Sequence, residues 1–80
     1  MKVEVYSAPW CPYCVVLEKK LGTLGVDYEY KNVDEPGVRE EMNQRTDGNQ
    51  TIPVLFVDEQ YWVNPDARVL AEQFKSRTKG

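Results

Sequence analysis

The two cysteines of the chain, Cys11 and Cys14, stand three positions apart in the stretch SAPWCPYCVVLEKK of residues 7–20. A bridge between them would close a loop too short to give much stabilisation, so a structural disulfide is the weaker interpretation. A zinc site needs about four ligands, and the chain has no histidine to complete one or to serve as the base of a cysteine protease. Thiol–disulfide exchange remains, because it needs only two sulfurs and surroundings that favour a thiolate.

The spacing predicts different roles for the two thiols. If Cys11 opens a helix, its sulfur faces unpaired backbone N–H groups and the positive end of the helix dipole, which favour the thiolate. Cys14, one turn further along the same face, should be more buried and less acidic. We therefore expect Cys11 to be the ionised, solvent-accessible nucleophile and Cys14 to be the resolving thiol. Pro12 suits a position that needs no N–H, and it stiffens the turn between the sulfurs.

The elements that position this pair are indicated by the periodicity of apolar residues. Residues 2–6 and 27–31 alternate in polarity as strands do. Between them, three leucines at helical spacing form one apolar stripe, namely Leu17, Leu21 and Leu24. A strand, a helix and a second strand form a βαβ unit, which requires the two strands to be parallel.

The second half of the chain predicts a helix, two strands and a last helix. Pro36 suits the first position of the second helix, which would direct Met42 into the core. The run TIPVLFV of residues 51–57 fits a buried strand with Pro53 at its start, and residues 61–63 fit a return strand.

The last helix is expected to follow Asn64 as its cap, with Pro65 in the first helical position and Asp66 at the positive end of the dipole. It should run to about residue 76. Its expected buried stripe is Ala67, Leu70, Ala71 and Phe74, and its expected basic end holds Lys75, Arg77 and Lys79. The order β-α-β-α-β-β-α predicts an α/β protein of one domain over residues 1–80, with a four-stranded mixed sheet flanked by three helices.

Charge and hydropathy argue against two classes of partner. The net charge is −3, whereas nucleic-acid binding usually needs a basic patch. The N-terminal residues alternate between apolar and charged types without a hydrophobic signal region, and no stretch reaches the roughly 20 apolar residues of a membrane span. We therefore expect a cytoplasmic monomer that contacts neither nucleic acid nor membrane.

Two motifs resemble those of dithiol glutaredoxins. The motif CPYC of residues 11–14 matches their active site, and TIP of residues 51–53 resembles their TVP motif, whose proline is cis. The resemblance covers nearly the whole chain and implies a thioredoxin fold, with a cis Pro53 beside Cys11 and the backbone of Ile52 paired with the bound thiol. The substrate-binding residues expected on these grounds are Trp10, Pro12, Tyr13, Thr51, Ile52, Pro53, Asn64 and Asp66.

The chain departs from most glutaredoxins after the return strand. They carry a Gly-Gly pair followed by Ser/Cys-Asp, where this chain has YWVNPDARVL over residues 61–70. The lysine that often precedes their motif is also missing. The NP of residues 64–65 and the DGNQTIP of residues 47–53 resemble instead the mycoredoxins, which reduce mixed disulfides of mycothiol. We therefore expect no bound cofactor or metal, and mycothiol or glutathione as the low-molecular-weight thiol co-substrate.

These patterns predict a thiol–disulfide oxidoreductase that acts on disulfide-containing or S-thiolated proteins. Its electrons would come from the small thiol or from a flavin disulfide reductase. One alternative is an electron-transfer redoxin fed by thioredoxin reductase and serving ribonucleotide reductase, in which an aromatic residue often stands near Trp62. Another is an iron–sulfur carrier, in which Cys11 of two chains and two small thiols would hold a [2Fe–2S] cluster, although Pro12 disfavours it. Three cations could attract an anionic thiol, or could be ordinary surface charges: Lys19, Arg39 and Arg45.

Overall fold

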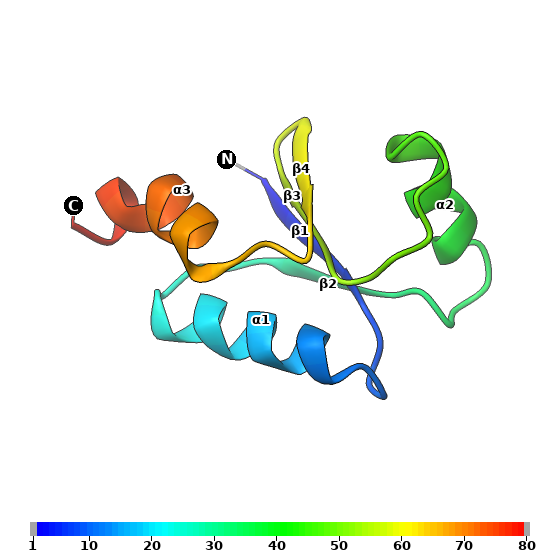
Figure 1. Cartoon of the computed structure of the whole chain (residues 1–80), viewed down its shortest axis with the longest axis horizontal. Helices are drawn as coiled ribbons and strands as arrows, with labels where there is room; N and C mark the ends of the chain where they lie inside the picture. The colour runs from blue at the N-terminus through cyan, green and yellow to red at the C-terminus, as the bar shows by residue number, and fades with distance from the viewer. Residues whose placement is uncertain (1, 80) are drawn as a thin grey trace.

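A computed structural model of the chain describes residues 2–79, and the side chains of residues 2–74. Over these residues the elements are β1 (Val3–Ser7), α1 (Pro12–Thr23), β2 (Glu29–Asn32), α2 (Val38–Arg45), β3 (Val54–Val57), β4 (Gln60–Val63) and α3 (Ala67–Lys79). The element order expected from the sequence is therefore confirmed. Figure 1 shows α1 and α3 on one side of the sheet and α2 on the other. Within residues 2–79 no helix combines the length and apolar character needed to cross a membrane.

The four strands form one mixed sheet in the order β2-β1-β3-β4. The central strand β1 runs parallel to β2 and antiparallel to β3, where Tyr6 lies opposite Val54. Because β1 and β3 are antiparallel, the end of β1 and the start of β3 meet at the same edge of the sheet. The connection from β1 into α1 leaves from that edge, so the sheet brings the start of α1 and the segment before β3 together.

Two apolar clusters cover the two faces of the sheet. Alternate residues of a strand point to opposite faces, which divides β1 and β3 between the clusters. On the face covered by α1 and α3, the buried members are Val3, Val5, Leu17, Leu21, Leu55, Val57, Leu70 and Phe74. On the face covered by α2, they are Tyr6, Ala8, Cys11, Cys14, Val33, Met42, Val54 and Phe56. The second cluster contains both cysteines, so the sheet and α2 set the surroundings of the thiols.

A carboxylate buried in β1 ties the sheet to α2. Glu4 keeps only 2% of its surface exposed, and it accepts hydrogen bonds from Arg45 at 2.9 and 3.0 Å. Lys31 of β2 lies 3.0 Å from the same carboxylate. The hydrogen bond from Arg45 is the main reason that the pKa of Glu4 falls from 4.5 to about 2. The Cζ atom of Arg45 also lies 3.8 Å from the centre of the Phe56 ring. Because Arg45 is held by the Glu4 carboxylate and this ring, it is not free to attract an anionic thiol.

Two helix starts differ from the sequence expectation. Helix α2 begins at Val38 rather than Pro36, because Gly37 takes the cap position with a φ of 83°, which glycine adopts without strain. Helix α3 begins at Ala67, and its cap is Asp66 rather than Asn64. The Oδ1 atom of Asp66 accepts the N–H of Val69 at 3.0 Å, as a cap side chain does.

The third helix is also longer and less buried than expected. It ends at Lys79, and only Leu70 and Phe74 of its expected stripe are buried, whereas Ala67 and Ala71 are exposed. An alanine side chain is too short to reach the sheet from the flank of that stripe. The expected basic end lies outside the side chains that the structure describes.

Candidate active site

Cys11 occupies the cap position of α1, as the sequence predicted. Its backbone is extended, with φ −95° and ψ 111°, and Pro12 follows in the first helical position. The Sγ atom of Cys11 accepts the backbone N–H of Cys14 at 3.3 Å, so the sulfur replaces the missing carbonyl partner of the first turn. A hydrogen bond of this kind becomes stronger when the acceptor carries negative charge. The start of α1 therefore presents a donor to any charge on this sulfur.

Both sulfurs are covered in the structure, and this corrects one expectation. Cys14 is fully buried, as expected, but Cys11 keeps only 4% of its surface and is not the open thiol that the sequence suggested. The geometry of the helix cap accounts for this burial. The conformation that brings Sγ of Cys11 to the Cys14 amide also places Cys11 in the apolar cluster on the α2 face of the sheet. Both thiols are unpaired, so the structure represents the dithiol state.

Burial gives Cys14 the character of a protonated thiol. Desolvation, with a further contribution from the neighbouring Cys11 sulfur, raises the pKa of Cys14 to about 11. The Ser7 hydroxyl and the backbone of Ala8 act in the opposite direction, since they favour the thiolate. A less acidic Cys14 agrees with the predicted resolving thiol, which must lose its proton only after a mixed disulfide has formed.

Two aromatic side chains stand at the rim beside the thiols. Trp10 is 62% exposed and Tyr13 is 65% exposed, and Pro12 between the cysteines is exposed as well. The Nε1 atom of Trp10 donates a hydrogen bond to Asp34 at 2.6 Å, and Asp34 lies 3.6 Å from Arg39. These contacts fix the indole, whereas the Tyr13 ring is free to meet a ligand. Because Arg39 is paired with the Asp34 carboxylate, it is less available to attract an anionic thiol.

The TIP segment lies at the same edge of the sheet as the start of α1. The peptide bond between Ile52 and Pro53 is cis, as the resemblance to glutaredoxins implied. Ile52 packs against the apolar cluster that contains both cysteines, and Pro53 is buried directly before β3. The Pro53 carbonyl accepts the N–H of Asn64 at 2.7 Å, which joins this segment to the end of β4. Thr51 is exposed.

A groove of about 230 Å³ lies between α1 and the connection from β4 to α3. Its lining residues are Tyr13, Val16, Leu17, Lys20, Asn64, Pro65 and Asp66. Tyr13, Asn64 and Asp66 were expected from the sequence, and the fold brings them together. The other expected substrate-binding residues lie outside this lining, namely Trp10, Pro12, Thr51, Ile52 and Pro53. Lys20 was missed, although its spacing of seven from Tyr13 places the two on one helical stripe. The structure therefore puts Lys20, and not Lys19, at the candidate thiol groove.

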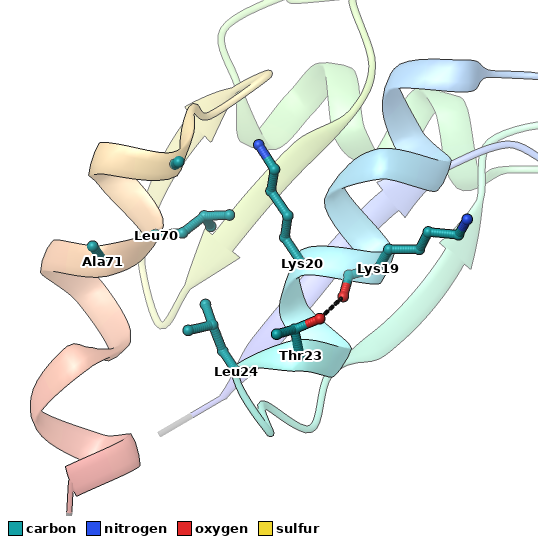
Figure 2. A pocket seen from close by; sticks show the side chains of 7 residues that line it. Lys19, Lys20, Thr23, Leu24, Leu70 and Ala71 are labelled. Carbon is teal, nitrogen blue, oxygen red and sulfur yellow. Dashed lines mark hydrogen bonds between the residues drawn. The ribbon is translucent and has the colours of Figure 1, made fainter.

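A larger cavity, of about 330 Å³, lies between the second half of α1 and α3. Figure 2 shows Leu24 and Leu70 facing each other across it, with Lys19 and Thr23 on the helix α1 side. Its nearest α1 residue lies eight positions after Cys11, which corresponds to about 12 Å along the helix. This cavity is therefore remote from Cys11, and both Lys19 and Lys20 line it.

Comparison with known proteins gives consistent matches. The profile of the glutaredoxin family matches residues 3–62. Glutaredoxin 3 of Escherichia coli is 37% identical over 60 residues, which cover 74% of this chain and 71% of that protein. A probable glutaredoxin of Synechocystis is also 37% identical over 60 residues, but these span only 55% of its length.

One solved structure illustrates the shared fold. The crystal structure of the thioredoxin-like protein BC3987, solved as a single-residue mutant, superposes with a TM-score of 0.81 at 26% identity. The match covers 94% of this chain and 95% of that one. The fold is therefore thioredoxin-like, with the four-stranded mixed sheet and three helices that the sequence predicted.

Proposed function

This chain belongs to the glutaredoxin family of thiol–disulfide oxidoreductases, and we propose that it reduces mixed disulfides between proteins and a low-molecular-weight thiol, either mycothiol or glutathione. The observation that carries the proposal is the Cys11 sulfur held at 3.3 Å by the Cys14 amide at the start of α1. A helix start favours the thiolate, which is the form that attacks disulfides. The buried thiol of Cys14 lies one turn behind it.

The proposed reaction has two steps. The Cys11 thiolate attacks the sulfur of the small thiol in the mixed disulfide, which forms a new bond to Cys11 and releases the protein cysteine as a thiolate that takes a proton from water. A second molecule of the small thiol then attacks this adduct and leaves as the oxidised small-thiol disulfide. In the dithiol route Cys14 attacks Cys11 instead, which makes an internal disulfide and releases the small thiol.

The groove beside Tyr13 is the proposed binding place of the small thiol. On the α1 side of the groove, Tyr13 presents an exposed ring and Lys20 presents an ammonium group. On the side of the β4–α3 connection, Asn64 and Asp66 present polar groups. Asp66 would repel a carboxylate but can accept hydrogen bonds from an amine or from sugar hydroxyls. The glycine pair of most glutaredoxins is absent here, so hydroxyl-rich mycothiol is an equal candidate to glutathione.

Docking must also uncover the nucleophile. Because Cys11 retains 4% of its surface in the free dithiol form, the substrate sulfur reaches it only when neighbouring side chains shift. The exposed rim residues Trp10 and Tyr13 are the first that a protein substrate would meet. A reducing compartment such as the cytoplasm would keep both thiols in the reactive state.

Supplying electrons from separate sources tests the proposal. A protein–glutathione or protein–mycothiol mixed disulfide is offered with the matching small thiol and its recycling reductase, or with thioredoxin reductase alone. Turnover with a small thiol supports the proposed function and identifies the co-substrate. Turnover with thioredoxin reductase alone would favour the redoxin alternative, and no turnover from any source would contradict the proposal. Cys11→Ser serves as the inactive control.

A further inference from the structure

A hydrogen-bonded pair that the reaction above does not use lies behind the thiols. The hydroxyl of Ser7, the last residue of β1, donates a hydrogen bond to the Oε2 atom of Glu18 at 2.7 Å. Ser7 is fully buried and Glu18 is half-buried. A buried serine hydroxyl bonded to a carboxylate that still reaches solvent forms a short polar path from the core to the surface.

Cys14 lies near the inner end of this path. Glu18 stands four residues after Cys14 on α1, so the two side chains occupy the same face of the helix, one turn apart. Ser7 comes from the strand beneath that face and is buried beside the first turn, where its hydroxyl is among the groups that favour the Cys14 thiolate. Glu18 also accepts a long hydrogen bond from the Tyr28 hydroxyl, at 3.4 Å, which helps to hold the carboxylate in place.

Cys14 needs such a path because of its burial. With no surface exposed, its thiol cannot pass a proton directly to water, and its pKa of about 11 leaves very little thiolate at neutral pH. The first step of the proposed reaction is not affected, since it uses Cys11. The dithiol step, in contrast, requires that Cys14 be deprotonated while it attacks.

We propose that Glu18 accepts the proton of Cys14 through the Ser7 hydroxyl when Cys14 attacks the mixed disulfide on Cys11. This inference rests on the proposed function, and it makes Glu18 and Ser7 positioning residues for the dithiol route only. The Ser7 hydroxyl is oriented toward the carboxylate, so it can pass its own proton to Glu18 as it receives the proton of the thiol.

The step balances without another reactant. The Cys14 sulfur forms a bond to the Cys11 sulfur, and the bond between Cys11 and the small thiol breaks. The small thiol leaves as a thiolate with the electron pair of that bond. The proton of Cys14 ends on the Glu18 carboxylate, which is half-buried and releases it to solvent, where the thiolate is protonated.

Few other ionisable groups face this path. Tyr28, directly before β2, and Tyr30 of β2 lie near Glu18, and burial, with the charge of Glu18 as a second cause, raises the pKa of both phenols. Cys11 is the neighbour at the cap of α1, and the members of β3 on the sheet face that Ser7 shares with Val3 and Val5 are the apolar residues Leu55 and Val57. Among these groups, Glu18 is the carboxylate that accepts the hydrogen bond of the Ser7 hydroxyl.

A two-phase reaction with 5,5′-dithiobis(2-nitrobenzoate) isolates the step. Attack by Cys11 releases one coloured nitrothiobenzoate anion and leaves the other attached to Cys11; attack by Cys14 then releases the second. In Glu18→Gln we expect an unchanged first release and a second release about a hundredfold slower at neutral pH, the lower end of what a positioned proton acceptor typically contributes. Ser7→Ala should show the same loss, and Ser7→Thr should restore most of it.

The pH profile separates proton transfer from a packing effect. In the parent protein the second release should change little across neutral pH, whereas in Glu18→Gln it should rise in proportion to hydroxide. Glu40→Gln, an exposed carboxylate on α2, is the matched control and should behave as the parent. An unchanged second release in Glu18→Gln, or an equal slowing at every pH, would overturn the inference alone. Absence of the first release in the parent would overturn the proposed function and this inference with it.

Discussion

The amide N–H of Cys14 donates to the Sγ atom of Cys11 at 3.3 Å, so one residue supplies both the backbone donor to the proposed nucleophile and the thiol that we propose resolves its adduct. The donor belongs to the backbone and the resolving thiol to the side chain. Substitution at position 14 can therefore remove the second role and keep the first, which makes the two roles separable by experiment.

Replacing the resolving thiol should leave the small-thiol reaction intact. In Cys14→Ser the backbone donor to Cys11 remains, so we expect turnover of small mixed disulfides within about threefold of the parent, while reduction of protein disulfides through the dithiol route is lost. Steady-state assays with both substrates measure this. Loss of both activities in a folded variant would show that Cys14 has a role in the first attack.

Lys20 and Lys19 provide a matched pair for the candidate thiol groove. Lys20 lines both the groove beside Tyr13 and the cavity against α3, whereas Lys19 lines the cavity but not the groove. We expect Lys20→Ala to raise the KM for an anionic small thiol about three- to fivefold with little change in kcat, as for loss of one partly exposed charge contact. Lys19→Ala should match the parent, and equal effects of the two substitutions would argue against this groove.

Removing Arg45 should destabilise the fold, because it leaves the buried carboxylate of Glu4 with Lys31 as its remaining partner. We expect Arg45→Leu to lower the free energy of unfolding by about 2–3 kcal/mol. Arg39→Leu, which breaks an exposed pair with Asp34, should cost at most about 1 kcal/mol. Urea unfolding followed by far-ultraviolet circular dichroism measures the free energy of unfolding of both variants. Similar decreases in the two variants would contradict the claim that the buried Glu4 carboxylate depends on Arg45.

The same carboxylate predicts part of the response to acid. Its pKa is about 2 in the folded protein and 4.5 ordinarily, so folding is favoured above the ordinary value and this contribution fades as the pH falls from about 5 toward 2. The stability difference between the parent and Glu4→Gln should therefore shrink over this interval, by up to about 3 kcal/mol. A difference that stays constant from pH 7 to pH 3 would show that Glu4 does not titrate in this way.

Local patterns predicted the fold and the position of the cysteine pair. Alternation marked β1 and β2, an apolar run marked β3, and the spacing of CPYC before an apolar helical stripe placed Cys11 at a helix cap. Local patterns were ambiguous at the start of α3, because Asn64 and Asp66 are both good caps. There the bond from Asn64 N–H to Pro53, between segments distant in sequence, places Asn64 outside the helix.

Contacts between distant segments were not visible in the sequence. The burial of Cys11 depends on residues from β1, α2 and β3, and the Ser7–Glu18 hydrogen bond joins a strand end to the middle of a helix. Arg45 looked like a surface charge because its partner Glu4 lies 41 positions away in the sequence. Contacts between side chains of different helices and strands decided these three cases.

The central claim is that Cys11 attacks and Cys14 resolves, and alkylation of the native dithiol protein tests it most directly. Iodoacetamide is added at pH 7 and the modified cysteine is located by peptide mass spectrometry over time. Because Cys14 is buried and its pKa is about 11, only about one in ten thousand of its thiols is ionised at that pH. The account predicts that Cys11 is modified at least tenfold faster than Cys14; equal rates, or modification of Cys14 first, would contradict it.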